Sequence, residues 1–431
     1  MSNMSAFKIV LISVFAVSAV VAVAMFALSK GGVGGGQSAN LLVWGTVSPE
    51  SFDVAYKNSS IKSDKQIQIT YVKKDPATFD ADFVEALATG TGPDIVVLRD
   101  DYLYKNSNKL FIIPFANYSG RSFKDTFIEG GEIFLTPSGV AALPFIVDPM
   151  VMYWNRDMFS NVTVSQPPKY WDEIYSLIPK MTVKDGSGSI LKSTIALGEW
   201  GNVSGAKEIV SMLLLQAGTP ITSRTANGLQ SVLNSLFDYS IAPSQSAVNF
   251  YTQFSNPTSP NYTWNRSLPL SLNMFLSGNL GLYLGFSSEI FAIQQKNSNL
   301  NFDVALVPQI RDTNKKEVFG HMYALAIVKQ SRQVGGAYLA INALTEATSI
   351  KALSATTNLP PVRRDLLSST PPDTFLSVFY NSALLSHSWI DPDSVASSKT
   401  FRDMIEGITS GRYRLSDALN NADDELTSEI K

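Results

Sequence analysis

The sequence contains no cysteine and only two histidines among its 431 residues. The lack of cysteine excludes disulfides, thiolate nucleophiles and cysteine-ligated zinc, and two histidines leave little scope for a Ser-His-Asp triad. Charged residues make up only 16% of the chain, the net charge is −3, and no long basic run occurs. The electrostatic footprint of a nucleic-acid-binding protein is therefore missing. Small polar solutes fit this composition better as partners, and nucleic acid is not expected.

Both histidines are interpreted as structural residues. His321 lies in FGHMYALAIV, which is expected to enter a strand, so a packed or capping role is favoured over a chemical one. His387 lies in SHSW, which matches no motif that would give it a function. The sequence therefore predicts no metal site and no cofactor.

A long apolar run lies near the N-terminus. Residues 9–28 carry no charge and are flanked by Lys8 and Lys30, and a helix of this length spans ~30 Å. A cleaved signal peptide is the alternative, because residues 27–29 resemble a small-residue cleavage site, although its apolar region normally has only ~7 to 15 residues. We therefore predict an uncleaved transmembrane helix with the rest of the chain on the extracytoplasmic face. The glycine-rich residues 31–38 are then a flexible tether.

The following region has the pattern of an α/β lobe. Residues 41–45 and 67–72 read as strands because of their β-branched residues and alternation. A helix is expected to begin at Asp75 as N-cap and to stop at Gly90, and residues 94–98 form a third strand. This strand-helix-strand order predicts a parallel sheet with right-handed crossovers.

The stretch GTGPDIVVLRDD ends this lobe's third strand with charged residues. Its glycines precede the strand, whereas a phosphate-binding loop follows a strand and opens a helix, so a nucleotide site is not predicted. Arg99, Asp100 and Asp101 emerge at the carboxyl end of the strand, where open α/β sheets bind ligands. The alternative for both aspartates is a solvated loop, since charges at strand ends are usually exposed.

A second lobe is indicated further along the chain. Residues 139–159 hold two strand-like runs broken by Asp148 and Pro149, and a proline interrupts ladder pairing. We interpret this break as the crossing point between two lobes. Residues 194–218 then repeat the strand, loop and helix rhythm of the first lobe.

The motifs LLVWG, ATGTGPDIVV, ALPFIVDPMVMYWNRDMF, PPKYWDEI and FLSGNLGLYLGFSS, in this order, resemble those of extracellular solute-binding proteins of family 1, the maltose-binding type. The resemblance covers nearly all of the chain after the tether. It implies a two-lobed periplasmic-binding-protein type II fold, in which each lobe is a mostly parallel sheet flanked by helices. It also implies that the chain captures a small polar solute and delivers it to the permease subunits of an ABC importer.

The resemblance and the patterns together predict six divisions of the chain. These are the anchor at 1–30, the tether at 31–38, the first lobe at 39–147 and 306–360, the second lobe at 148–305, and C-terminal helices at 361–431 that lie mainly in the second lobe.

Ligand-binding residues are carried over by position from the resemblance. They are Thr46, Asp100, Asp101 and Tyr102 in the first lobe, Asp148 at the hinge, and Glu199, Trp200, Phe286, Ser287 and Trp389 in the second lobe. Carboxylates and aromatic faces suit sugars, because carboxylates accept hydrogen bonds from hydroxyls and aromatic planes cover the apolar face of a pyranose. The chain departs from the maltose-type pattern at Tyr102, where an arginine is usual, and at Leu98, where an aromatic is usual. These departures argue against maltodextrin itself as the solute.

The sequence therefore predicts a membrane-tethered carbohydrate receptor without catalytic residues. One alternative is a bilobal surface sensor or scaffold that has no transport role. The other is a glycosidase that uses Asp101 with Glu199 or Asp148, which would require two carboxyl groups about 5 to 9.5 Å apart.

Overall fold

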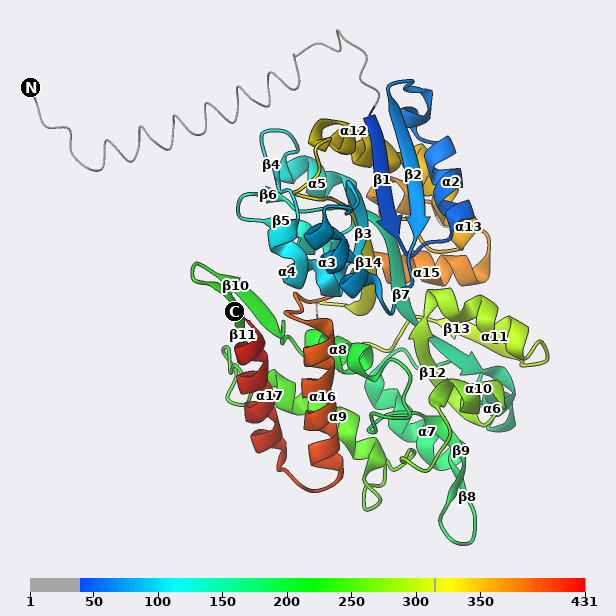
Figure 1. The fold of residues 1–431 in the computed structure, drawn as a ribbon. Helices are drawn as coiled ribbons and strands as arrows, with labels where there is room; N and C mark the ends of the chain where they lie inside the picture. The colour runs from blue at the N-terminus through cyan, green and yellow to red at the C-terminus, as the bar shows by residue number, and fades with distance from the viewer. Residues whose placement is uncertain (1–38, 314, 370, 431) are drawn as a thin grey trace, which may run out of the picture.

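The computed structural model describes residues 39–313, 315–369 and 371–430 (Figure 1). The predicted anchor at residues 9–28 and the tether at residues 31–38 lie outside these ranges. Among the described residues, no helix is both long enough and apolar enough to cross a membrane.

The described chain forms two α/β lobes that share one long sheet (Figure 1). The strand order is β2-β1-β3-β14-β7-β12-β9-β8, with β13 paired to β7 and β15 paired to β14. The strands are β1 (Ala39–Gly45), β2 (Ile67–Lys73), β3 (Ile95–Arg99), β7 (Leu143–Asn155), β8 (Val183–Lys184), β9 (Ile190–Ile195), β12 (Leu280–Phe286), β13 (Phe302–Ala305), β14 (Val318–Ile327) and β15 (Ser386–His387). A small separate sheet contains β4 (Ile113–Pro114), β5 (Leu135–Thr136) and β6 (Gly139–Val140), and β10 (Thr222–Thr225) forms a hairpin with β11 (Gly228–Ser231).

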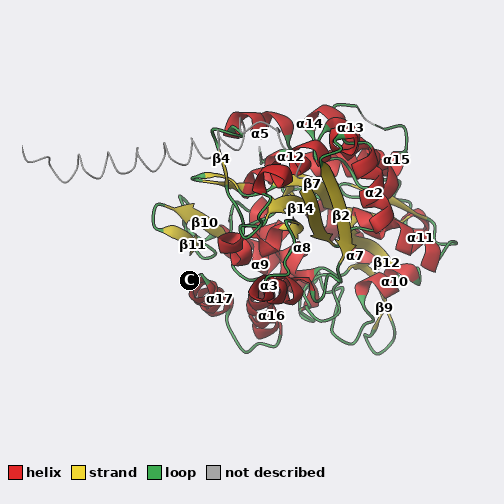
Figure 2. Cartoon of the chain, turned by 45° about the horizontal axis from the view of Figure 1, so that its top comes forward, coloured by secondary structure: helices red, strands yellow, loops and turns green. Residues whose placement is uncertain are grey.

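The first lobe is built on β1, β2 and β3, which are paired in parallel as predicted. Helices flank these strands on both sides (Figure 2). They are α2 (Pro49–Lys57), α3 (Phe79–Thr89), α4 (Leu103–Asn106), α5 (Gly120–Thr126), α12 (Val334–Leu344), α13 (Ala347–Thr357) and α14 (Arg364–Leu367).

The predicted start of α3 is wrong. The Asp75 side chain accepts the N–H of Ala77 in a local turn, so Asp75 does not cap the helix. The helix begins at Phe79, with Thr78 in the cap position. The predicted stop is confirmed, because Gly90 follows the last helical residue with a φ of 72°.

Strand β7 joins the two lobes, and the predicted break within it is wrong. The strand runs without interruption from Leu143 to Asn155 and is buried along its whole length. Its pairing partner changes at the expected place, because β14 pairs with it as far as Pro149 and β12 pairs with it from Met150 onward. Proline has no N–H to donate to a ladder and therefore lies where one partner strand gives way to the next. The change of partner strand thus falls at the position where the sequence placed the crossing between the lobes.

The second lobe is built on β12 and β9, which are parallel to each other, with β13 antiparallel to β7. Its helices are α6 (Arg156–Asn161), α7 (Ile174–Met181), α8 (Ala206–Gln216), α9 (Pro243–Thr252), α10 (Ser271–Leu276), α11 (Ile290–Lys296), α16 (Ser394–Thr409) and α17 (Leu415–Glu429). The remaining helix, α15 (Thr374–Leu384), contributes to both cores, through Phe379 in the second lobe and Ala383 in the first.

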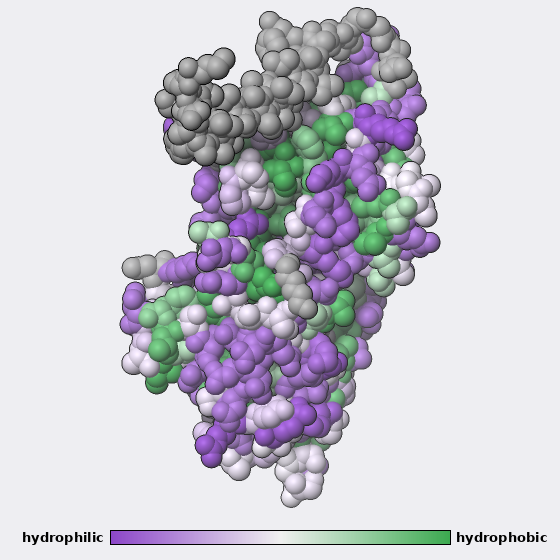
Figure 3. All heavy atoms as spheres, turned by 60° about the vertical axis from the view of Figure 1, so that its left-hand side comes forward, coloured by the Kyte–Doolittle hydropathy of each residue, from purple (hydrophilic) through white to green (hydrophobic). Residues whose placement is uncertain are grey.

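Each lobe has its own hydrophobic core, and the division between the cores falls within β7. Residues up to Val147 pack in the first core, and residues from Met150 pack in the second. In the face drawn in Figure 3, hydrophilic side chains cover most of the lower, second lobe, and hydrophobic ones appear in smaller patches. Each lobe thus buries its own apolar residues, an organisation typical of two-lobed proteins that close about a hinge.

Candidate functional site

The candidate site begins at the carboxyl end of β3. Asp100 and Asp101 open the short 3₁₀ turn η2 (Asp100–Tyr102) that directly follows the strand. Their exposed fractions are only 2% and 6%, which rules out a solvated loop. A buried carboxylate is costly unless it is paired, so the partners of each aspartate determine what the site can do.

Asp101 connects the two lobes. Arg99 Nε and Nη2 donate to its two carboxylate oxygens at 2.6 and 2.5 Å, and the Ser394 hydroxyl, at the start of α16, donates to Oδ2 at 2.6 Å. Burial alone would raise the pKa of Asp101, but the hydrogen bonds and charge of Arg99 lower it to about 2. Asp101 is therefore a carboxylate at any ordinary pH.

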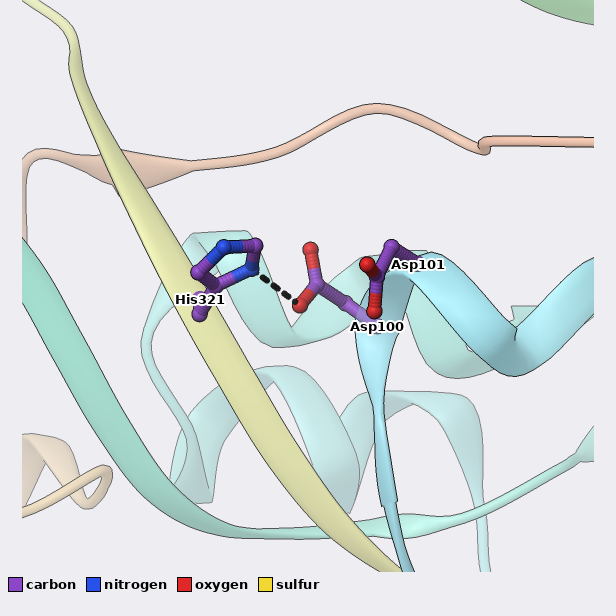
Figure 4. Close-up of side chains that lie close together, drawn as sticks. All are labelled: Asp100, Asp101 and His321. Carbon is purple, nitrogen blue, oxygen red and sulfur yellow. Dashed lines mark hydrogen bonds and ion pairs between the residues drawn. The ribbon is translucent and has the colours of Figure 1, made fainter. Parts of the chain in front are cut away.

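Asp100 is paired with a buried histidine, His321. Its Oδ1 lies 3.1 Å from His321 Nδ1, as drawn in Figure 4, and also accepts the N–H of Met322 at 3.1 Å. The other ring nitrogen of His321 lies 3.5 Å from Oε1 of Glu208, in the first turn of α8. Burial by itself would lower the pKa of His321, but the charge of Asp100 and the hydrogen bonds to Asp100 and Glu208 raise it to about 10. His321 is thus an imidazolium at neutral pH.

Asp100, Asp101 and His321 are, within the described residues, the one group whose ligand atoms approach closely enough for a metal ion, at 4.8 Å or less. An imidazolium that directs both N–H groups at carboxylates has no lone pair to offer a metal. The cluster is therefore better described as an ion network than as a metal centre.

A small pocket between the lobes is lined by this network and its neighbours. The lining residues are Asp100, Asp101, Lys207, Glu208, Phe319, His321, Trp389 and Asp391. Its volume is about 10 Å³, which is about enough for one water. Lys207 Nζ lies 2.5 Å from Asp391 Oδ2, and these two side chains are 12% and 2% exposed. That pair lies within the second lobe, and the lobes are held closed by contacts that cross between them, in which the Ser394 hydroxyl donates to Asp101 and Glu208 lies 3.5 Å from His321.

A second pocket, of about 40 Å³, lies on the first lobe beside Arg99. It is lined by Thr46, Pro76, Phe79, Val97, Arg99, Tyr102 and Tyr323. The predicted site residues Thr46 and Tyr102 thus lie together, at the ends of neighbouring strands. The Tyr102 ring also lies 5.4 Å from the Arg99 guanidinium.

The hinge brings together three further predicted residues. Asp148 accepts hydrogen bonds from the Ser287 hydroxyl at 2.8 Å and from the Ser288 N–H at 3.0 Å. The Phe286 ring stacks on His321 with its centroid 5.2 Å away. Asp148 is buried, and burial raises its pKa despite these hydrogen bonds. The hinge carboxyl is thereby linked to the turn that follows β12.

A family model described as "bacterial extracellular solute-binding protein" matches residues 59–375, more than half of the chain. This chain belongs to that family. Membership in a family of binding proteins agrees with the prediction that the chain is not an enzyme and removes the support for a glycosidase.

Solved structures of other solute-binding proteins have the same fold. A cyclo/maltodextrin-binding protein complexed with maltotetraose has a TM-score of 0.72 at 16% identity and covers 92% of this chain and 99% of its own. A cyclic alpha-maltosyl-1,6-maltose binding protein from Arthrobacter globiformis has a TM-score of 0.74 at 16% identity, with 91% and 99% covered. The GacH receptor of Streptomyces glaucescens has a TM-score of 0.65 at 14% identity, with 91% and 100% covered.

Matches among curated proteins are shorter. Binding proteins from Brucella abortus (strain 2308) and Brucella suis biovar 1 (strain 1330) are 28% identical to this chain over 104 residues. That segment is 23% of this chain and 25% of each relative, so the match spans about a quarter of the relatives' length.

Two of the predicted residues of this solute-binding protein lie apart from Asp101. Glu199 is buried and its Oε2 lies 3.4 Å from Nη2 of Arg266, an exposed residue. Trp200 packs against the second core. Neither side chain lines the two pockets described above.

Trp389 lies largely within the core of the second lobe. Its indole is 5% exposed and stacks on Phe401 at 5.8 Å between ring centroids. Its N–H donates to the Ser211 hydroxyl at 3.1 Å. Only a small part of the ring is left to line the pocket between the lobes, so a stacking platform for a sugar would require the lobes to open.

The sequence interpretation missed four residues of the network: Lys207, Glu208, His321 and Asp391. Lys207 and Glu208 lie in the first turn of α8, separated from the end of β9 by a loop, so they lack the position directly after a strand that singled out Asp100. His321 was interpreted as packed or capping. It is packed, but it is also ion-paired, and no sequence pattern places its carboxylate partners beside it.

Proposed function

We propose that this protein is a membrane-tethered extracytoplasmic receptor of an ABC-type importer that binds a carbohydrate between its two lobes. The observation that carries the proposal is the pocket in which Asp100 and Asp101 of the first lobe meet Lys207, Glu208 and Asp391 of the second. Polar side chains from both lobes converge there, at the hinged crossing point where a two-lobed protein closes on its ligand.

The side-chain chemistry of this region supports a carbohydrate. Asp101 and Asp100 offer carboxylate oxygens to hydroxyl donors, and Tyr102 and Trp389 lie close enough to contribute aromatic surface. Solved relatives with this fold include complexes with maltotetraose and with acarbose, according to their descriptions. We propose that the full contact set consists of the predicted first-lobe residues with Asp148, Phe286, Ser287 and Trp389, while Glu199 and Trp200 contribute little.

The membrane tether rests on the sequence alone. Residues 9–28 form an uncharged apolar run with lysine on either side, and residues 31–38 are rich in glycine. A tethered receptor remains close to the permease subunits that would accept its solute, whereas a receptor whose apolar run is cleaved as a signal peptide would diffuse away.

The function is tested by thermal unfolding of residues 39–431, which contain both cores, against mono- and oligosaccharides, polyols, amino acids and peptides. A ligand present at about 100 times its dissociation constant stabilises the folded state by ~2.7 kcal/mol, so the midpoint should rise clearly with a sugar. A rise with another solute class would keep the receptor and reject the carbohydrate. No rise with any solute would favour the sensor or scaffold.

Asp101→Ala should weaken binding of the solute found in that panel about tenfold or more. Hydrogen bonds to a charged group contribute ~1.5 to 3 kcal/mol, and each 1.4 kcal/mol is a factor of ten in affinity. Isothermal titration calorimetry measures the change, with Glu199→Ala as the matched control because it also removes a buried carboxylate. We expect the control to stay within about twofold of the wild type, and equal effects of the two variants would show that the site is placed wrongly.

A further inference from the structure

His321 lies at the junction of the two lobes. It is on β14, opposite Asp148 of β7 in the antiparallel register, and next to the point where β7 changes partner. Its exposed fraction is 8%, and its ring is held between Phe286, which stacks on it, and Phe319, which meets it edge-on. The aromatic rings fix the imidazole plane, so its two nitrogens point in set directions.

The two nitrogens of His321 face carboxylates from different lobes. Asp100 follows β3 in the first lobe, and its Oδ1 is also held by the N–H of Met322. Glu208 lies in the first turn of α8, whose next residues, Ile209 and Val210, are buried in the second core. Opening of the lobes would therefore separate Glu208 from the imidazole, while Asp100 would remain beside it.

The other charged groups near His321 are already held by other partners. Arg99 is paired with Asp101, and Lys207 is paired with Asp391. Asp148 also faces the imidazole, but it is held by the Ser287 hydroxyl and the Ser288 N–H. Asp100 and Glu208 are therefore the carboxylates that the His321 proton neutralises in the closed arrangement.

We propose that protonated His321 pins the lobes of this protein together, donating Nδ1–H to Asp100 and Nε2–H to Glu208, so that closure takes up a proton. Loss of the proton leaves the buried Asp100 carboxylate and the partly buried Glu208 carboxylate facing a neutral ring, and opening relieves the repulsion by moving Glu208 away. The inference deepens the proposed function, because closure is the step that traps a solute, but its test requires no solute.

The direction of the pH effect follows from the pKa of His321 in the two arrangements. In the closed arrangement this pKa is about 10, compared with an ordinary value of 6.5. In the open arrangement it falls below the closed value because Glu208 has gone, yet Asp100 keeps it above the ordinary one. The closed arrangement is thus fully favoured at low pH. The closed-to-open ratio then falls as pH rises between the two pKa values, by at most tenfold per pH unit.

Energy transfer between dyes on the two lobes tests the proposal with the full-length chain in detergent and no solute. The chain has no cysteine, so Ser122→Cys in α5 and Ser246→Cys in α9 supply the only thiols, both at exposed positions. We expect high transfer at pH 6 and a fall toward pH 10, with a midpoint between 6.5 and 10. His387→Gln changes the only other histidine and should leave this titration unchanged.

Two variants distinguish a histidine whose proton holds the lobes together from one that only packs at their junction. His321→Gln should remove the pH dependence of transfer between pH 6 and 10. If that variant fails to fold, Glu208→Gln remains informative, because its side chain is 20% exposed and the change keeps its shape. It should flatten the transition, because without the Glu208 charge the pKa of His321 differs little between the two arrangements. Constant transfer in the wild type, or a wild-type transition in Glu208→Gln, would overturn the proposal whatever solute the protein binds.

Discussion

Replacement of Lys207 by methionine is expected to lower the free energy of unfolding by about 3 to 5 kcal/mol, the cost of breaking a buried ion pair from one side. Lys207 is the cation of such a pair, since its Nζ lies 2.5 Å from Asp391 Oδ2 and also donates to the Ser394 carbonyl at 3.0 Å. Methionine retains the apolar stem but leaves the Asp391 carboxylate buried without its counterion. Chemical denaturation at pH 7 measures the loss.

The pH dependence of that loss distinguishes electrostatics from packing. Burial already raises the pKa of Asp391 in the wild type, and removal of Lys207 should raise it further. A carboxyl group with a raised pKa in the folded state destabilises the protein above the pKa of the unfolded chain, about 3.9, and ceases to do so as it is protonated. The difference from the wild type should therefore be largest at pH 7 and should shrink toward pH 4.

Lys57→Met is the matched control for this prediction. Lys57 also forms a close ion pair, at 2.6 Å with Asp53, but its side chain is 60% exposed. An exposed pair one helical turn apart contributes less than about 1 kcal/mol. Equal losses in the two variants, or a Lys207→Met loss that does not change with pH, would contradict the role of burial.

The first lobe was predictable from the sequence because its signals are local. The alternation and β-branched content that predict β2, and the glycine that ends α3, depend only on residues close by in the sequence. The order strand, helix, strand then requires parallel pairing, which β1, β2 and β3 show. The start of α3 was missed because Asp75 caps a turn as readily as a helix, and only the tertiary setting decides between them.

The crossing point was predictable, but the form of the crossing was not. Asp148 and Pro149 were correctly taken to mark the change of lobe. They were wrongly expected to interrupt the strand, because pattern reasoning treats proline as a break. A strand whose partner changes at the proline loses no ladder hydrogen bond there, so β7 continues through it.

The candidate site was predictable on one lobe and largely hidden on the other. Asp100 and Asp101 were singled out because they follow the carboxyl end of a strand, which is where open α/β sheets bind ligands. Glu208 and Asp391 approach them from segments distant in the sequence, and only the closure of the lobes brings them together. Glu199 is a further example, because it forms an ion pair with Arg266 and no pattern in the sequence predicts that pair.

Gly130→Ala should lower the free energy of unfolding by about 3 kcal/mol, at the upper end of what overpacking a well-packed region costs. Gly130 lies in the 3₁₀ turn η4 (Glu129–Phe134), which packs against β15. A Cβ at this position would lie 2.1 Å from the carbonyl oxygen of Ser386, a backbone atom that cannot rotate away. The turn would have to move off β15, which pairs with β14 three residues before His321. Thermal unfolding and denaturant titration measure the loss.

Gly186→Ala is the control for Gly130→Ala because nothing lies within 4 Å of the added Cβ and the residue is exposed. Its effect should stay within about 0.5 kcal/mol and could be slightly stabilising, since alanine restricts the unfolded chain. Similar small effects at both positions would mean that η4 moves freely away from β15. Because η4 belongs to the first lobe and β15 pairs beside the strands that connect the lobes, such freedom would place the flexible part of the hinge at this contact. A large loss of unfolding free energy in Gly130→Ala alone would instead show that the contact between η4 and β15 is rigid and helps to hold β14, and with it His321, in place.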